Sequence, residues 1–406
     1  MPNQLKLLLN LLGLAMILTS CQSSAAALSQ KNAQTAQSQG TMTYSSYRPE
    51  QAQHVLAHKL PKKIHARGIY VSGWVAGSNK ALNRLLGLLD RTDLNTLVID
   101  VKADEGRLTY TSSIPLVKEI GADANPAIQD IRALLNRLKA KQIYTIGRIV
   151  TFKDPYLAKR KPEWALHKKN GAVWHDVKGT AWLDPYLEKT WDYNIAVAVE
   201  AARFGFDEIQ FDYVRFPDNA RRVKQEVAFT NQQGRTRAEA IRQFLHRARP
   251  AIHAAGSYVS ADVFGLVTSE KNDMGIGQVW EQIAREVDYI SPMTYPSHYS
   301  SGVYGITHPD LAPGSVIRHA MIDAKKRNDE ITASNSEQVI ASQPGYQRSA
   351  NYPAEIRPWL QNFTATWIRS HRSYGESEVI QQVKALEGQG IHQFLLWNSK
   401  CKYDYK

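Results

Sequence analysis

The chain has 406 residues, of which 43% are hydrophobic and 22% are charged, an ordinary balance for a folded protein with a sizeable core. This length is sufficient for one α/β barrel, and the two cysteines, Cys21 and Cys401, are too few for a cysteine-rich zinc or iron–sulfur site. The formal net charge of +12 suits nucleic acid, anionic lipid or an acidic polysaccharide, but the basic residues are dispersed, which favours a solvated surface over an anionic glycan or envelope partner.

Residues 1–21 are typical of a bacterial lipoprotein signal peptide. Lys6 precedes an apolar run over residues 7–18 that is too short for a stable transmembrane helix and fits a secretory signal. Residues 18–21, Leu-Thr-Ser-Cys, match the bacterial lipobox, whose cysteine becomes the lipidated N-terminus. We therefore expect lipidation of Cys21 and attachment to the cell envelope without a spanning helix. The alternative is an ordinary signal peptide with a chance cysteine.

Export and anchoring lead to three further expectations. Gln22, directly after the cysteine, favours the outer membrane, with the protein facing the periplasm or the surface. Export argues against nucleic acid as a partner. With Cys21 lipidated, Cys401 has no partner for an intramolecular disulfide.

Residues 22–62 are rich in Ser, Gln, Ala and Thr and predict a flexible tether. Over residues 63–406, strand-like apolar runs alternate with helical patterns, which predicts a single α/β domain, a (β/α)₈ TIM barrel. The predicted strands cover residues 68–72, 96–101, 144–150, 208–213, 258–263, 288–293, 357–361 and 393–397. The seventh contains Pro358, which cannot donate to a sheet ladder. The clearest helical stretches are 127–141, 188–204, 236–254 and 376–389.

The connection between the third and fourth predicted strands is unusually long, from Phe152 to Pro185. It includes a predicted hairpin at Asn170-Gly171, the favoured pair for a type I′ turn, and long βα loops usually build the substrate cleft of a barrel. The sequence has no G-x-G-x-x-G turn, Walker loop, helical H-x-x-x-H pair or G-x-S-x-G elbow. We therefore expect no cofactor and no metal.

Barrel enzymes work at the carboxyl ends of their strands, and residues two apart on a strand share a face. On the fourth predicted strand, Gln210 and Asp212 therefore point into the barrel. Phe211 and Tyr213 are expected to point toward the surrounding helices. Asp212 lies nearer the catalytic end.

The second and fifth predicted strands bring further polar residues to the same end of the barrel. Ser260 and Asp262 share the equivalent face of the fifth strand. Asp100, Lys102 and Asp104 are expected to share that face on the second strand. A carboxylate in or on top of a barrel is costly unless it is paired or used.

Glycoside hydrolysis needs two carboxyl groups that flank the scissile bond. Asp212 and Asp262, on adjacent strands, are suitably placed to supply them. The alternative for any one of these acids is a structural salt bridge with a basic residue such as Lys102, Arg148 or Arg215.

Aromatic residues also gather at the strand ends and in the long loop. Flat aromatic side chains pack against the apolar C–H faces of sugar rings. Trp397, next to Asn398 at the end of the eighth strand, is the preferred candidate for the floor of a subsite. The full set of candidate aromatic contacts is Tyr70, Trp74, Trp182, Tyr295 and Trp397.

The run GFDEIQFDYVRFP, residues 205–217, resembles the strand-four signature of a family of bacterial (β/α)₈-barrel proteins named for a predicted glycoside hydrolase activity. Further segments resemble the family in the same order, at residues 67–70, 101–106, 148–154, 181–186, 260–265 and 290–296. The resemblance spans nearly the whole predicted domain. It implies a barrel fold and hydrolysis of O-glycosyl bonds.

This family is similar in turn to α-amylase-type and chitinase-like barrels. By the resemblance to α-amylase-type enzymes, Asp212 matches their strand-four nucleophile. Their strand-five acid/base is Glu, whereas this chain has Asp262, so Glu105 and Asp104 after strand two are alternative proton donors. The paired acids ending in Glu on strand four of chitinase-like barrels are absent, although residues 293–295, Met-Thr-Tyr, resemble their strand six.

The sequence thus predicts a glycoside hydrolase acting on an envelope or extracellular polysaccharide. Asp212 attacks or stabilises the anomeric carbon, a second acid donates the proton, and other polar side chains hold the sugar, namely Arg148, Gln210, Arg215 and Tyr295. The alternative is a non-catalytic glycan-binding or scaffold lipoprotein on a degenerate barrel. A second carboxyl group about 5–5.5 Å from Asp212 would suit a retaining hydrolase, and one at about 6.5–9.5 Å an inverting one.

Overall fold

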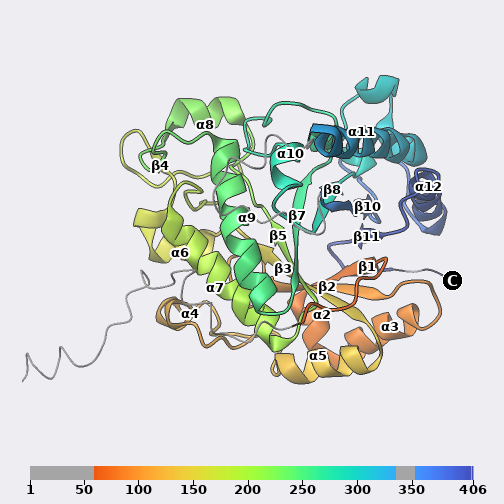
Figure 1. The fold of residues 1–406 in the computed structure, drawn as a ribbon, viewed down its shortest axis with the longest axis horizontal. Helices are drawn as coiled ribbons and strands as arrows, with labels where there is room; N and C mark the ends of the chain where they lie inside the picture. The colour runs from red at the N-terminus through yellow and green to blue at the C-terminus, as the bar shows by residue number, and fades with distance from the viewer. Residues whose placement is uncertain (1–58, 335–352, 404, 406) are drawn as a thin grey trace, which may run out of the picture. The chain divides into compact units, whose positions relative to one another are not determined.

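The computed structural model describes residues 59–334, 353–403 and 405. Figure 1 shows this part of the chain as a set of strands surrounded by helices. The predicted signal peptide, the lipidation site Cys21 and tether residues 22–58 lie outside the described residues. Within the described ranges, no helix has both the length and the apolar character that crossing a membrane requires.

Eight parallel strands form a closed barrel, which confirms the predicted (β/α)₈ fold. Their hydrogen-bonded order is β10-β11-β1-β2-β3-β5-β7-β8, and β10 also pairs with β8, through Trp359 and Met293, so the ring closes. The strands are β1 (Arg67–Val71), β2 (Thr96–Lys102), β3 (Tyr144–Val150), β5 (Glu208–Asp212), β7 (Tyr258–Phe264), β8 (Tyr289–Met293), β10 (Trp359–Gln361) and β11 (Phe394–Trp397).

The seventh strand is interrupted at its proline, as the sequence indicates. β9 (Glu355–Ile356) and β10 both pair with β8, and Arg357 and Pro358 between them belong to neither strand. Pro358 has no N–H to donate. The segment nevertheless stays bonded to the neighbouring strand β11, because the carbonyl of Pro358 accepts a hydrogen bond from Leu395 N–H at 2.9 Å.

Helices cover the outside of the barrel. Figure 1 shows α7 beside α9 and α11 near α12. The helix predicted over 127–141 begins only at Ile131, because the Asp130 side chain caps it by accepting from Ala133 N–H at 2.9 Å. The α-helices are α2 (Gly73–Gly77), α3 (Asn79–Leu89), α4 (Pro115–Ile120), α5 (Ile131–Ala140), α6 (Pro155–Arg160), α7 (Glu188–Phe204), α8 (Ala220–Glu226), α9 (Arg237–Ala254), α10 (Trp280–Ile283), α11 (Pro313–Ser334) and α12 (Glu376–Glu387).

The strands are buried on both faces, as in a parallel sheet covered by helices. Phe211 packs outward against Phe244 of α9, with ring centroids 5.0 Å apart, as the alternation predicts. Inside the barrel, at the start of β5, Glu208 forms a buried ion pair with Arg357 and accepts a hydrogen bond from Ser260. This polar layer ties β5, β7 and the break before β10 together beneath the carboxyl ends of the strands.

The connection between β3 and β5 is elaborated as predicted. Its short strand β4 (His167–Lys168) pairs with β6 (Val227–Ala228), in the loop that follows β5. The predicted hairpin forms, but its turn is not type I′, because Asn170 is not among the described residues with positive φ. Instead, Gly171 N–H donates to Lys168 O at 2.9 Å, and Gly171 itself has φ +84. This is the pattern of a three-residue turn with a glycine bulge.

Candidate active site

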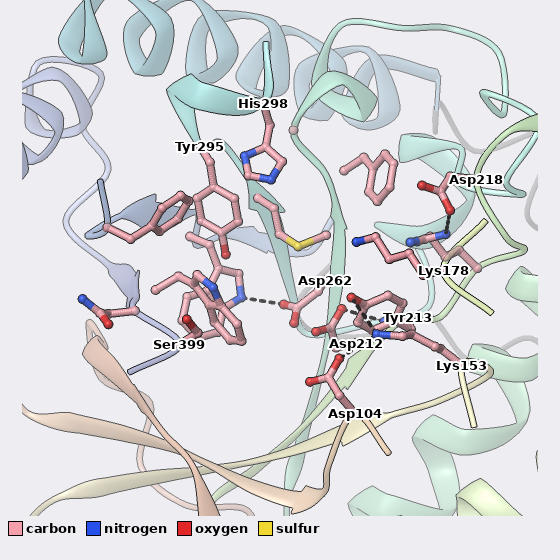
Figure 2. Close-up of a pocket in the computed structure, with 18 of the residues that line it drawn as sticks. Asp104, Lys153, Lys178, Asp212, Tyr213, Asp218, Asp262, Tyr295, His298 and Ser399 are labelled. Atoms are coloured by element: carbon pink, nitrogen blue, oxygen red, sulfur yellow. Dashed lines mark hydrogen bonds and ion pairs between the residues drawn. The ribbon is translucent and has the colours of Figure 1, made fainter. Parts of the chain in front are cut away.

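A cavity of about 870 Å³ opens at the carboxyl ends of the strands. Its walls come from the ends of β2, β3, β5, β7, β8, β10 and β11 or from the loops that follow them. Figure 2 shows the carboxyl groups of Asp104, Asp212 and Asp262 close together in this cavity. The cavity therefore lies at the end of the barrel where barrel enzymes carry their catalytic residues.

Asp212 is the last residue of β5 and is almost fully buried. Its Oδ2 accepts two hydrogen bonds from Arg148 of β3, from Nε at 2.9 Å and from Nη2 at 2.6 Å. Its Oδ1 accepts from the backbone N–H of Tyr213 at 2.6 Å. These bonds orient the carboxylate and compensate its charge.

Arg148 also binds two carboxylates from the β2 side. Its Nη1 donates to Asp100 Oδ1 at 2.7 Å, and its Nη2 lies 3.3 Å from Asp104 Oδ2. The Tyr70 hydroxyl donates to the other oxygen of Asp100 at 2.6 Å. Burial raises the pKa of Asp100, although the charge of Arg148 opposes this shift. One buried arginine thus links acids from β2 and β5, which would be costly to bury without it.

Asp262 on β7 is the second carboxyl group of the cavity. β5 and β7 pair in register up to Phe211 and Ala261, so Asp212 and Asp262 follow side by side on adjacent strands. Asp262 Oδ1 accepts from the indole Nε1 of Trp359 at 2.8 Å. Burial, and next the charge of Asp212, raise the pKa of Asp262 well above the ordinary carboxyl value. The two neighbouring acids therefore differ, because Asp212 is paired with an arginine and Asp262 favours its protonated form.

The two acids after β2 occupy different positions. Asp104 lines the cavity, and its side chain is 44% exposed and lies 3.0 Å from Lys153 Nζ. Burial opposes ionisation of Asp104, but Arg148 and Lys153 outweigh it and lower its pKa. Asp104 is therefore better suited to act as a carboxylate than as a proton donor. Glu105 is exposed and does not line the cavity.

The expectation that Lys102 shares the barrel-facing side of β2 with Asp100 is wrong. The pairing of β2 with β3 shifts between these two residues, and such a bulge disrupts the alternation of side chains. Lys102 Nζ instead contacts Asp154 Oδ2 and Asn194 Oδ1, both at 2.8 Å, and Asn194 belongs to α7. Lys102 therefore lies between the barrel and its helices, away from the cavity.

The expectation that Tyr213 points toward the helices is also wrong. β5 ends at Asp212, and Tyr213 has φ +50, so the alternation of the strand stops there and the Tyr213 side chain lines the cavity. Lys153 Nζ lies 3.4 Å from its hydroxyl and 4.4 Å from the centre of its ring. Figure 2 shows Tyr213 and Lys153 beside the three acids.

Three of the five aromatic residues expected to contact sugar line the cavity, and two do not. Trp182, Tyr295 and Trp397 belong to its walls. Tyr70 is buried against Trp397, with ring centroids 4.3 Å apart. Trp74 on α2 is 62% exposed and lies outside the cavity.

The polar residues expected to hold the sugar are also divided. Arg148 and Arg215 line the cavity. The guanidinium of Arg215 lies 4.6 Å from the ring centre of Phe264 and 5.0 Å from that of Trp182, so aromatic rings hold it in the wall. Gln210 is fully buried inside the barrel and does not reach the cavity.

Several lining residues are not among those predicted from the sequence. Lys178, Phe363 and Trp367 belong to loops, and His298 ends the short 3-10 helix η5 (Pro296–His298), and the residue pattern indicates the course of none of these segments. Trp359 lies in the predicted seventh strand, where alternation along the strand could have identified it. Among the described residues, no cluster of three or more His, Cys, Asp or Glu side chains is arranged to hold a metal ion.

Comparison with known protein families places the chain in one of them. A family model described as "Putative glycosyl hydrolase domain" matches residues 68–403. A hypothetical protein from Ruminiclostridium thermocellum is 38% identical over 51% of this chain and 98% of its own, with a TM-score of 0.44. A comparison with curated protein sequences found no match.

More distant solved structures are glycoside hydrolases. The glycoside hydrolase domain of PgaB (BpsB) from Bordetella bronchiseptica is 12% identical, with a TM-score of 0.56 over 83% of this chain and 95% of that domain. The α-galactosidase TtGalA from Thermus thermophilus is 11% identical, with a TM-score of 0.47 over 86% of this chain and 61% of that enzyme. The likeness to the PgaB domain shows a shared barrel fold.

Proposed function

The chain belongs to this glycosyl hydrolase family, and on that basis we propose that it hydrolyses a polysaccharide with Asp212 and Asp262 as its catalytic pair. The observation that carries the proposal is the difference between these two neighbours. Asp212 is bound by Arg148, whereas Asp262 is buried with a raised pKa. Glycoside hydrolysis needs one carboxylate and one carboxylic acid beside the scissile bond.

In the proposed reaction, Asp212 is the nucleophile and Asp262 the acid/base. The carboxylate of Asp212 attacks the anomeric carbon while the glycosidic C–O bond breaks, and Asp262 gives its proton to the leaving oxygen. Water then attacks the anomeric carbon, the bond to Asp212 breaks, and the carboxylate of Asp262 takes a proton from that water.

Register supports this double displacement over a single inversion. Asp212 and Asp262 follow the last paired residues of β5 and β7, and adjacent strands lie about 4.8 Å apart. That spacing is close to the separation of about 5–5.5 Å between the carboxyl groups of retaining enzymes. Inverting enzymes separate the two groups by about 6.5–9.5 Å to admit a water molecule.

The cavity walls suit a saccharide. Trp182, Tyr295 and Trp397 offer aromatic surface, while Lys153 and Arg215 offer hydrogen-bond donors. A volume of about 870 Å³ lies near the upper end of the range for ligand sites, which leaves room for more than one sugar ring.

We propose an envelope or extracellular polysaccharide as the substrate class. The support is the signal peptide predicted at residues 1–21, with its lipobox at Cys21. A lipid anchor there would hold the enzyme at a membrane surface, where envelope glycans are concentrated.

The test is product release from a panel of bacterial envelope and capsular polysaccharides by the wild type and by Asp212→Asn. The asparagine is nearly isosteric, so the variant should fold and lose cleavage. Cleavage by the wild type alone would establish a hydrolase and identify its glycan. Binding without cleavage by either protein would reject hydrolysis and favour a glycan-binding lipoprotein.

A further inference from the structure

A row of aromatic rings leads from the catalytic acids to the rim of the cavity. Tyr295 contacts Phe363 edge to face, with centroids 5.6 Å apart and ring planes at 76°. Phe363 stacks on Trp367, with centroids 6.0 Å apart and planes at 18°. All three residues line the cavity that contains Asp212 and Asp262.

Trp367 is unusual because 68% of its surface is exposed. Tryptophan is highly buried on average in folded proteins, and an exposed ring contributes little to the core. Here the exposed ring is on a cavity wall and is supported from behind by Phe363. An apolar surface that is exposed and continuous with a polar site is typical of a ligand contact.

The loop that carries these rings is anchored to the barrel. Gln361, the buried last residue of β10, donates from Nε2 to the carbonyl of Phe363 and to Asp310 Oδ1, both at 3.0 Å. Asp310 Oδ2 accepts from the backbone N–H of Arg372 at 3.1 Å, on the other side of Trp367. Because both sides of the loop are held, the ring needs little ordering when a ligand binds.

The opposite rim is formed by the long loop between β3 and β5. Val177 there is 73% exposed, and its neighbour Lys178 also lines the cavity. Figure 2 shows the Lys178 side chain extending into the cavity above Asp212 and Asp262. The space between this rim and Trp367 is therefore bordered by apolar surface and by a hydrogen-bond donor. A sugar ring presents the complementary chemistry, C–H faces and hydroxyl groups.

We infer that Phe363 and Trp367 form an outer subsite that stacks on a pyranose ring of the polymer, at a distance from the bond that is cleaved. This inference rests on the proposed function, because it takes Asp212 and Asp262 as the cleavage point. Trp367 lies two ring contacts outward from Tyr295, so the sugar on Trp367 is not the one attacked. The enzyme then holds several units of the chain and acts on long substrates better than on short ones.

The test compares wild type and Trp367→Ala on oligosaccharides of increasing length, prepared from the polysaccharide that the wild type cleaves. Loss of one stacking platform at a binding centre should lower kcat/KM on long oligosaccharides about tenfold or more, through KM. The shortest cleavable substrate, which does not reach Trp367, should be unaffected. Trp367→Phe keeps a flat ring and should recover part of the loss.

Trp74→Ala is the matched control, because it removes a similarly exposed tryptophan from outside the cavity. An equal loss at every substrate length in Trp367→Ala would indicate a structural role and overturn the subsite. Unchanged KM on the longest substrate would overturn it as well.

Binding separates this inference from the proposed function. The wild type could bind a panel polysaccharide in affinity electrophoresis without cleaving it, while Trp367→Ala weakens that binding. This result would reject the proposed hydrolysis and support the outer subsite. If the wild type cleaves the polysaccharide but Trp367→Ala binds and cleaves long chains equally well, the outer subsite is rejected and the proposed hydrolysis is supported. If the exposed ring is instead a protein-docking surface, no polysaccharide affinity will depend on it.

Discussion

Arg148 and Asp212 are joined by two hydrogen bonds to a single carboxylate oxygen, at 2.9 and 2.6 Å, and both side chains are almost fully buried. The third guanidinium nitrogen binds Asp100. A buried charge is tolerated when it is paired and hydrogen-bonded, and breaking such a pair is far more costly than losing an exposed one. The arrangement therefore makes Arg148 a positioning residue for Asp212 and a stabilising residue for the barrel.

Replacement of Arg148 should reduce both stability and activity. Arg148→Met leaves Asp100 and Asp212 without their buried counter-charge. This should lower the free energy of unfolding by roughly 3–5 kcal/mol. Arg148→Lys keeps the charge but not the forked geometry, so it should be more stable than the methionine variant yet still impaired in kcat. Urea denaturation and kcat on the identified polysaccharide check both effects. A methionine variant as stable as the wild type would contradict the prediction.

Asp262 should control the alkaline side of the pH profile. Burial and the charge of Asp212 raise its pKa, so the proton needed by the leaving group is retained above the ordinary carboxyl range and lost as pH rises through the raised pKa. Asp262→Asn should lower kcat on the polysaccharide about 10²- to 10⁴-fold and abolish that limb. Aryl glycosides with an acidic phenol leaving group need little protonation in the first step, so their kcat/KM should fall much less than that of the polysaccharide.

The same shift predicts the stability of this variant. A raised folded-state pKa means that the stabilising contribution of Asp262 is present below the unfolded carboxyl pKa, about 3.9, and is lost as pH rises through the folded value. Asp262→Asn removes the free-energy cost of ionising this buried carboxyl group and keeps a side-chain oxygen that can accept a hydrogen bond from Trp359. It should therefore unfold at neutral pH at the same temperature as the wild type or a higher one, which calorimetry measures. A clear fall in Tm would show that ionised Asp262 stabilises the fold.

The pair of Glu208 and Arg357 should contribute to stability without a direct role in catalysis. Both side chains are fully buried at the start of β5 and outside the cavity lining. Arg357→Met alone should cost roughly 3–5 kcal/mol in unfolding free energy, because the fully buried Glu208 loses the positive charge that opposes the burial-driven rise of its pKa. Adding Glu208→Gln should recover most of that loss. A double variant less stable than Arg357→Met would show that the network around Glu208 matters more than its charge.

Asp288 predicts an acid-sensitive contribution to stability. Burial opposes its ionisation, but hydrogen bonds and charges from His253 and Arg249 hold its pKa well below the ordinary value. A depressed folded-state pKa gives stability above the unfolded value of about 3.9, and that stability is lost as pH falls further toward the folded value. Asp288→Asn should therefore lower the unfolding free energy most near neutral pH. The difference in unfolding free energy between this variant and the wild type should become smaller below about pH 3.9. A difference that does not change with pH would show that the ionisation of Asp288 does not stabilise the fold.

The pattern of the chain was sufficient to predict the barrel. Each strand is a short apolar run between helical patterns, and a strand buried on both faces has few alternative interpretations. Alternation along β5 also put Gln210 and Asp212 inside the barrel and Phe211 outside it. Register then set Asp262 beside Asp212, since the two residues stand at the same height on neighbouring strands.

The same alternation failed where the backbone left the regular strand. The bulge after Asp100 turned Lys102 outward, and the positive φ of Tyr213 turned its ring into the cavity. A local change in φ and ψ costs little and follows from contacts made elsewhere in the fold, so the residue types at these positions do not reveal it.

The (β/α)₈ architecture, the family and the strand-end acids are predictable from the chain alone, because they follow from periodic burial and from short motifs along it. The pairs of groups that meet in the cavity emerge only in the folded protein: Arg148 with Asp212, Trp359 with Asp262, and Phe363 with Trp367. Side-chain contacts between distant strands and loops depend on register, bulges and loop course. The protonation preference of Asp262 depends on those contacts, since burial and a neighbouring charge exist only once the strands are assembled.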